Sequence, residues 1–251
     1  MRRLGIIAAA LTAILVVAAV ALAEQQNTYT VNGKVTPTKA GTTKKPTPVK
    51  INFDYTVGEV NNQRPNPTKK YAIAFDGIRT NGGKFPACPA KKINAAAGDV
   101  SGCPAGSAVG SGSISAEVGA PSDPTTKVPC KLTLTVYNGG QNKAALFIKG
   151  GPPTCPTAQA KAIDASYIQS SKGTSLQFVV PPELLHQLGL DIATTNVQST
   201  IKLLTRKVKG KTYGYYESVG GCKGGRRNIT VSFTSESNVT KKAQKTLHCT
   251  T

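Results

Sequence analysis

The sequence predicts an all-β fold, an antiparallel β-sandwich of about eleven strands, jelly-roll or immunoglobulin-like in type and stapled by disulfides. Apolar and polar residues alternate with a period of two in several segments, while helical periodicity is nearly absent. Clusters of Gly, Pro, Asn and Ser separate these segments, and no helices alternate with them. This arrangement is typical of stacked antiparallel sheets.

The clearest strand signal lies in KINFDYTV, residues 50–57, where Ile51, Phe53 and Tyr55 alternate with polar residues. The same alternation, or a shorter apolar run, predicts strands at 28–35, 70–78, 112–119, 131–138, 144–150, 162–168, 174–180, 199–207, 212–219 and 228–234. One short helix is expected in PPELLHQLG, where Pro182 begins it and Gly189 ends it.

The first 23 residues read as a secretory signal peptide. Arg2 and Arg3 precede an apolar run over 4–22, and Ala21-Leu22-Ala23 fits a small-residue cleavage site, so cleavage is expected after Ala23. The alternative is a single membrane anchor, because the run is almost long enough to span a bilayer. After cleavage, residues 24–251 are expected to form one secreted or cell-surface domain without a transmembrane segment. A loop break is expected near 120–128.

The chain is strongly basic. It has 31 Lys and Arg against 12 Asp and Glu, and removal of Arg2 and Arg3 leaves 29 against 12, a net charge of +17. A net positive charge of this size favours anionic partners, for example a cell-wall polymer or an acidic polysaccharide. The alternative is that the charge serves solubility alone. Specific nucleic-acid recognition is not expected, since Trp is absent and aromatic residues make up only 6% of the chain.

One stretch concentrates this charge and precedes a run of tyrosines. The candidate anion-binding residues are Lys202, Arg206, Lys207, Lys209 and Lys211. Tyr213 and Tyr215 follow at a spacing that puts both rings on one face of a strand, where they form either a sugar-binding platform or ordinary sheet packing.

All six cysteines follow the signal peptide, and an even number in an exported chain indicates three disulfides. Pairing of neighbours in sequence is the simplest connectivity, so the expected pairs are Cys88 with Cys103, Cys130 with Cys155, and Cys222 with Cys249. A zinc site is not expected, because zinc-binding cysteines lie two to four residues apart within a pair. The segment between Cys88 and Cys103 is therefore interpreted as a stapled turn.

No catalytic residues or cofactors are predicted. The carboxylates are scattered, and His186 is the only plausible base for a serine triad. GSAVG places Gly106 next to Ser107, which is the wrong frame for a nucleophile elbow.

Four segments resemble a family of uncharacterised secreted β-rich proteins from actinobacteria. They are FPAC ending at Cys88, CPAGSAVGSG from Cys103 to Gly112, VYNGG from Val136 to Gly140, and GGCKGGRRNITVSFT through LHC from Gly220 to Cys249. Arg227-Asn228 stands where an aromatic residue is common in that family, and the Cys130/Cys155 pair is not part of its pattern. The resemblance implies export and carries over no catalytic residues.

These observations together predict a non-enzymatic secreted or cell-envelope protein that is structural or binds anionic surface polymers. A carbohydrate-binding module is the first alternative, and an extracellular hydrolase is the second. A two-tyrosine face on a concave sheet would favour the first, and a carboxylate pair in a cleft would favour the second.

Overall fold

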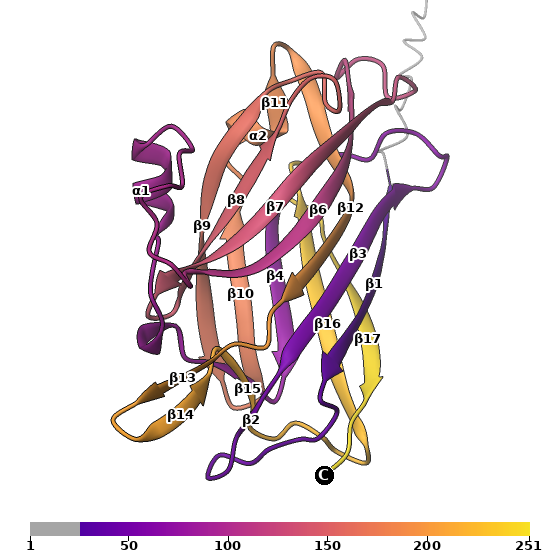
Figure 1. The fold of residues 1–251 in the computed structure, drawn as a ribbon. Helices are drawn as coiled ribbons and strands as arrows, with labels where there is room; N and C mark the ends of the chain where they lie inside the picture. Colours follow the sequence, from indigo (N-terminus) through magenta and orange to yellow (C-terminus); the bar gives the residue numbers. More distant parts are fainter. Residues whose placement is uncertain (1–25) are drawn as a thin grey trace, which may run out of the picture.

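Antiparallel strands make up most of the structure, a computed structural model that describes residues 26–251 (Figure 1). The predicted signal peptide, residues 1–23, lies outside the described residues. In chain order the elements are β1 (Asn27–Thr36), β2 (Thr47–Pro48), β3 (Lys50–Glu59), β4 (Thr68–Asp76), β5 (Ile78–Thr80), a 3₁₀ turn η1 (Gly82–Lys84), α1 (Ala90–Ala95), β6 (Ala108–Gly119), β7 (Val128–Gly140), β8 (Lys143–Gly150), β9 (Gln159–Ser170), β10 (Gly173–Val179), α2 (Pro182–Leu185), β11 (His186–Gln187), β12 (Leu190–Ile201), β13 (Thr205–Val208), β14 (Lys211–Gly214), β15 (Tyr216–Ser218), β16 (Arg226–Ser235) and β17 (Thr240–His248). The all-β prediction is confirmed.

One large sheet contains most of these strands. Its order is β1-β3-β12-β6-β7-β8-β9-β10-β4-β16-β17, with β11 paired to β12, and its ladders are antiparallel. Two small sheets, β13-β14 and β2-β15-β5, lie at one end of it (Figure 1). Among the described residues, no helix is long and apolar enough to cross a membrane.

The large sheet curves back on itself around a single apolar interior. β3 and β4 lie far apart in the strand order, yet the ring centroids of Phe53 and Phe75 are 5.8 Å apart, and those of Tyr55 and Phe233 are 5.3 Å apart. The two terminal strands of the order also lie side by side, and the Lys241 ammonium donates a hydrogen bond to the Asn27 carbonyl at 3.3 Å (Figure 1). Side chains from opposite regions of the sheet therefore share one core.

The alternation seen in the sequence decides which residues enter this core. In β3, Ile51, Phe53 and Tyr55 are buried, while Asn52 and Asp54 between them are half-buried on the outer face. Successive side chains of a strand point to opposite faces, so each apolar residue on the inner face removes surface from water while its neighbour stays hydrated.

A second, smaller apolar cluster lies on the outer face of β8 and β9, under α1 (Figure 1). Ile93 is fully buried there against Tyr137 and Phe147. The Cys88–Cys103 disulfide brackets this segment. The predicted stapled turn is thus a stapled helical segment, and the expectation of a single helix in the chain is wrong.

Three strand predictions also need correction. The predicted strand 212–219 is divided between β14, which ends at Gly214, and β15, which begins at Tyr216 and belongs to the other small sheet. The segment 199–207 is not one strand, because β12 ends at Ile201 and β13 begins at Thr205. β17 was not expected, since its KKAQK core reads as polar. A lysine-rich strand suits the end of a sheet order, because charge there opposes pairing with another chain.

Candidate functional site

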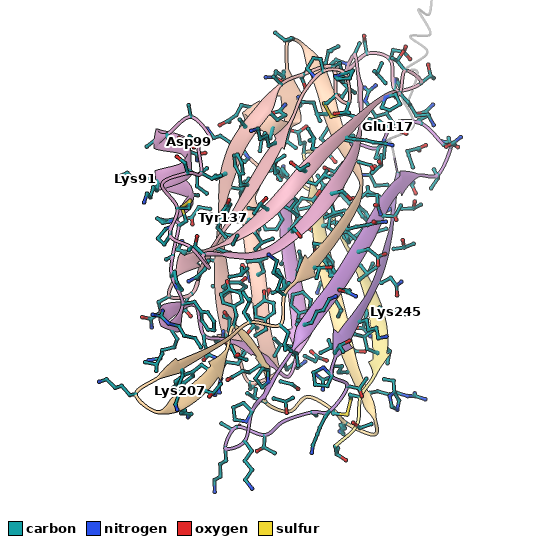
Figure 2. The ribbon with its side chains drawn as sticks, viewed as in Figure 1. Lys91, Asp99, Glu117, Tyr137, Lys207 and Lys245 are labelled. Carbon is teal, nitrogen blue, oxygen red and sulfur yellow. A yellow bond between two sulfur atoms is a disulfide. The ribbon has the colours of Figure 1, made fainter. Side chains whose placement is uncertain are left out.

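Positive charge gathers at the end of the molecule where the two small sheets lie, which we call the basic end. It comprises the loop 37–49, the β9–β10 turn, residues 202–214 with the β13–β14 hairpin, and the loop 219–225 (Figures 1 and 2). Its exposed cations, together with those that flank it, are Lys39, Lys44, Lys45, Lys84, Lys172, Lys202, Arg206, Lys207, Lys209, Lys211, Lys223 and Arg226.

The carboxylates nearest to this end are already engaged. The loops 37–49, 202–214 and 219–225 contain no Asp or Glu. Glu217 is only 1% exposed, pairs with Arg79 at 2.7 Å and accepts a hydrogen bond from the Gly214 amide at 2.9 Å. Asp76 is half-buried and accepts a hydrogen bond from the Asn228 amide. Exposed cations therefore greatly outnumber the carboxylates at this end.

The β13–β14 hairpin presents the densest part of this charge. Lys209 and Gly210 form its tip, both with positive φ, as a tight two-residue turn requires. The Arg206 guanidinium donates to the Lys84 carbonyl at 2.9 Å, which ties the hairpin to the body. Lys207, labelled in Figure 2, and Lys211 remain exposed on the projecting part. The structure thus brings the five predicted cations into one connected segment.

An open cleft of about 670 Å³ lies in the basic end. Its walls are the β4–β5 connection, the β9–β10 turn and the loop 219–223, and its charged lining residues are Arg79, Lys172, Lys223 and Asp76. Gly77 and Gly221, both with positive φ, cross so closely here that a Cβ on Gly221 would lie 2.5 Å from the Gly77 Cα atom. The sequence pattern did not indicate this cleft, because its cations come from three separate segments.

The opposite end, which we call the capped end, has a different character. It comprises the loops 60–67, 120–127, 151–158, 180–189 and 236–239. Arg64 is 2% exposed and lies 3.6 Å from the Asp191 carboxylate, and its guanidinium donates to the carbonyls of Ala120 and Asp123. Glu59, Asp123, Glu183, Asp191 and Glu236 all lie at or beside this end together with Arg64, Lys69, Lys127 and Lys161, so its charges nearly balance, whereas the basic end has a large excess of cations.

His186 links two of these carboxylates. Nε2 lies 2.7 Å from Glu236, and Nδ1 lies 3.0 Å from Asp191. The hydrogen bond to Glu236, with a smaller contribution from Asp191, raises the pKa of His186. Because both ring nitrogens are engaged, neither is free to serve as the base of a serine triad, the role considered for this residue in the sequence.

The structure corrects the predicted tyrosine platform. Tyr215 is fully buried, and its hydroxyl lies 3.4 Å from that of Tyr167, which also accepts from Tyr216 at 2.9 Å. Burial raises the pKa of Tyr215 well above its usual value. Tyr213 is half-buried, with the ammonium groups of Lys211 and Lys84 lying 5.2 and 5.5 Å from its ring centroid. The two tyrosines therefore do not share an exposed face.

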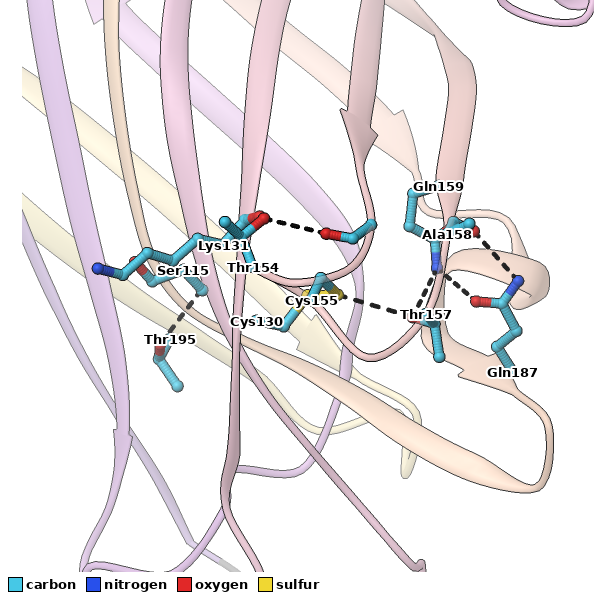
Figure 3. The surroundings of a disulfide bond; sticks show 11 residues. Ser115, Cys130, Lys131, Thr154, Cys155, Thr157, Ala158, Gln159, Gln187 and Thr195 are labelled. Carbon is cyan, nitrogen blue, oxygen red and sulfur yellow. Dashed lines mark hydrogen bonds between the residues drawn. A yellow bond between two sulfur atoms is a disulfide. The ribbon is translucent and has the colours of Figure 1, made fainter.

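The three disulfides are confirmed with the expected pairing: Cys88–Cys103, Cys130–Cys155 and Cys222–Cys249. Within the described residues no cysteine is left free, and no three His, Cys, Asp or Glu side chains group as a metal site. The Cys130–Cys155 bond ties β7 to the loop before β9 at the capped end (Figure 3).

Comparisons with protein-family models, with curated proteins and with solved structures find no match for this chain. The candidate site therefore rests on its own geometry and charge.

Proposed function

We propose that this protein binds anionic polymers or surfaces of the cell envelope through its basic end. The observation that carries the proposal is the concentration of positive charge: exposed cations from four separate segments meet at one end, where Glu217 is paired with Arg79 and Asp76 accepts a hydrogen bond from the Asn228 amide. A uniform basic surface made for solubility would not need this arrangement.

The hairpin and the cleft suit an extended polyanion. Lysine is a compact charge on a flexible stem, and it attracts anionic groups without demanding one geometry. The hairpin places Lys207, Lys209 and Lys211 on a projecting segment, while Lys172 and Lys223 line the neighbouring cleft. We expect binding that depends on charge density more than on the chemistry of one unit of the polymer.

The proposed binding of envelope polymers is part of a wider proposal about the location and the family of this protein. We infer export through the signal peptide at 1–23, a location outside the cell or on its surface, and membership of the actinobacterial family that the sequence resembles. Three disulfides support an oxidising compartment. We also propose that the curved sheet is a sandwich of two facing layers, which the ring contact between Phe53 and Phe75 supports.

The test is binding to dextran sulfate and to polyglutamate, measured by calorimetry at about 20 mM and about 300 mM salt. Screening acts over about 8 Å at physiological salt, so affinity should fall steeply between the two conditions. Changing Lys207, Lys209 and Lys211 to glutamine should weaken binding several-fold at low salt.

The matched control changes Lys70, Lys131 and Lys149 to glutamine. These lysines are exposed, lie outside the basic end and alter the net charge equally. Their loss should change affinity much less than the hairpin variant does. Equal losses in the two triple variants would show that only net charge matters, and salt-resistant binding would overturn the electrostatic proposal.

A further inference from the structure

We propose that the interior of this protein is a binding site for a single unbranched hydrocarbon chain, entered beside α2 at the capped end. The starting observation is an apolar cavity of about 100 Å³ inside the curved sheet. This is far more than the roughly 10–15 Å³ that one water molecule needs. Close-packed interiors contain few voids larger than one water.

The walls of the cavity suit a hydrocarbon and not water. They come from both regions of the curved sheet and include Ile73, Leu134, Leu146 and Ile163. A water held here would need two to four polar partners, and the mostly apolar lining offers few polar side chains, among them Gln159, Thr194 and Ser199. An apolar chain needs none.

The cavity is elongated along the strands. On β12 its lining begins at Ile192 and ends at Ile201, ten residues that span roughly 30 Å at the rise of a strand. A long, narrow apolar space fits an extended alkyl chain better than a compact ring system.

We place the entrance beside α2. Phe178, Val180 and Thr194 line the cavity and are reached in part by solvent, and Leu184 and Leu185 of α2 line the same region. The Phe178 ring stacks on Tyr71 with a centroid distance of 5.0 Å. α2 is a single turn, so little structure covers the cavity at this point.

The surroundings of this entrance are apolar as well. Leu188 is 85% exposed and Val179 is 58% exposed, on either side of α2. Leu188 also has a φ of 55°, a backbone conformation that bulky residues rarely adopt. Leu188 and Gly189 form the two-residue turn between β11 and β12, which requires the positive φ and projects the leucine into solvent. An apolar side chain in this position suits a rim over which an apolar chain enters.

A polar group marks where the chain would end. Gln159 lines the cavity, and its amide donates to Gln187 at 2.9 Å, while Gln187 donates to the Ala158 carbonyl (Figure 3). These amides lie between the cavity and the surface loop held by Cys130–Cys155. We place the polar end of a bound chain beside them.

The test uses the absence of Trp from this chain. Phe178→Trp puts a single fluorophore at the entrance, and 11-bromoundecanoate quenches tryptophan on contact through its bromine. Saturable quenching, reversed by the uncharged competitor 1-decanol, is the expected result. The control is Phe85→Trp, whose site is half-buried near Lys84 at the basic end and does not line the cavity. It reports adsorption of the anionic probe to surface lysines and should show no saturable quenching.

Ala116→Leu in the Phe178→Trp background should fill the cavity and weaken probe binding at least tenfold. Ala72→Leu adds the same volume on the outer face of β4, outside the cavity lining, and should leave binding unchanged. Equal quenching of the two tryptophans, or unchanged binding in a folded Ala116→Leu variant, would overturn the proposal. If that variant does not fold, the competition experiment tests the proposal instead, because failure of 1-decanol to displace the probe would also contradict it. None of these results depends on the basic end.

Discussion

Single residues show how the chain separates buried polar groups from exposed charge. Tyr167, Tyr215 and Tyr216 form a buried cluster in which each hydroxyl has another hydroxyl within 3.4 Å. Hydroxyls are retained in an apolar interior when they are hydrogen-bonded. This cluster lies directly beneath the basic end, and its packing supports the loops there.

The first prediction distinguishes the ring of Tyr215 from its hydroxyl. Tyr215→Ala should lower the free energy of unfolding by about 3–5 kcal/mol, because it leaves a cavity where an aromatic ring was fully buried. Tyr215→Phe should cost about 0.5–1.5 kcal/mol, the net value of one hydrogen bond. Urea denaturation measures both. A Tyr215→Ala protein as stable as the wild type would mean that the ring is not in the core.

The second prediction concerns His186 and pH. Its pKa is raised in the folded protein by Glu236 and Asp191, so its pairing stabilises the fold fully below the unfolded pKa of about 6.5 and is lost as pH rises through the folded value. The melting temperature of the wild type should therefore exceed that of His186→Gln more at pH 5.5 than at pH 8.5. Thermal melts across that range measure the difference, and a constant gap would contradict the assigned ion pairs.

The sequence predicted some of these residue roles and not others. The charged stretch from Lys202 to Lys211 was identifiable because its lysines are adjacent in sequence. The role of Tyr215 was not, because β14 ends at Gly214 and the chain turns into the core before β15 begins. The period of two holds only within one strand.

Among the elements, the stapled segment around α1 stands apart from the main core. It buries Ile93 on the outer face of β8 and β9, and the Cys88–Cys103 bond closes it. α1 has only six residues, too few to be stable without such packing.

The third prediction follows from this separation. Replacing Cys88 and Cys103 with alanine should increase hydrogen exchange at the α1 amides by an order of magnitude or more, while the amides of β6 and β7 keep their protection. A disulfide closing a loop of this size contributes about 3 kcal/mol in the chain-entropy model. Mass spectrometry of exchange reports both regions at once. A uniform rise over β6 and β7 would show that α1 is part of the main cooperative unit.

Strands in which apolar and polar residues alternate regularly were predictable from the sequence. Elements in which a register shift or a short length interrupts that pattern were not. β3 and β16 have one apolar face each, which their patterns show directly. β12 carries a register shift between Thr194 and Asn196, which breaks its alternation. α1 had a local signal in Pro89 before an alanine-rich run that ends at Gly98, but the neighbouring cysteines favoured a turn.

Over the whole molecule, the two ends differ in charge and in exposed apolar surface. The basic end has a large excess of cations, with Leu203 exposed among them, whereas Val60, Val179, Leu188 and Val239, all exposed, lie at the capped end. Net charge was predictable from composition, but its concentration at one end depends on which turns the topology places together. The proposed polymer site and the proposed apolar site therefore occupy different ends and are testable separately.

The most direct test of the central claim is hydrogen–deuterium exchange of the whole protein with and without dextran sulfate at low salt. The account predicts slower exchange at 37–49, 202–214 and 219–225, reversed by high salt, with no change at 60–67, 120–127 or 180–189. Protection spread evenly over both ends, or confined to the capped end, would contradict it.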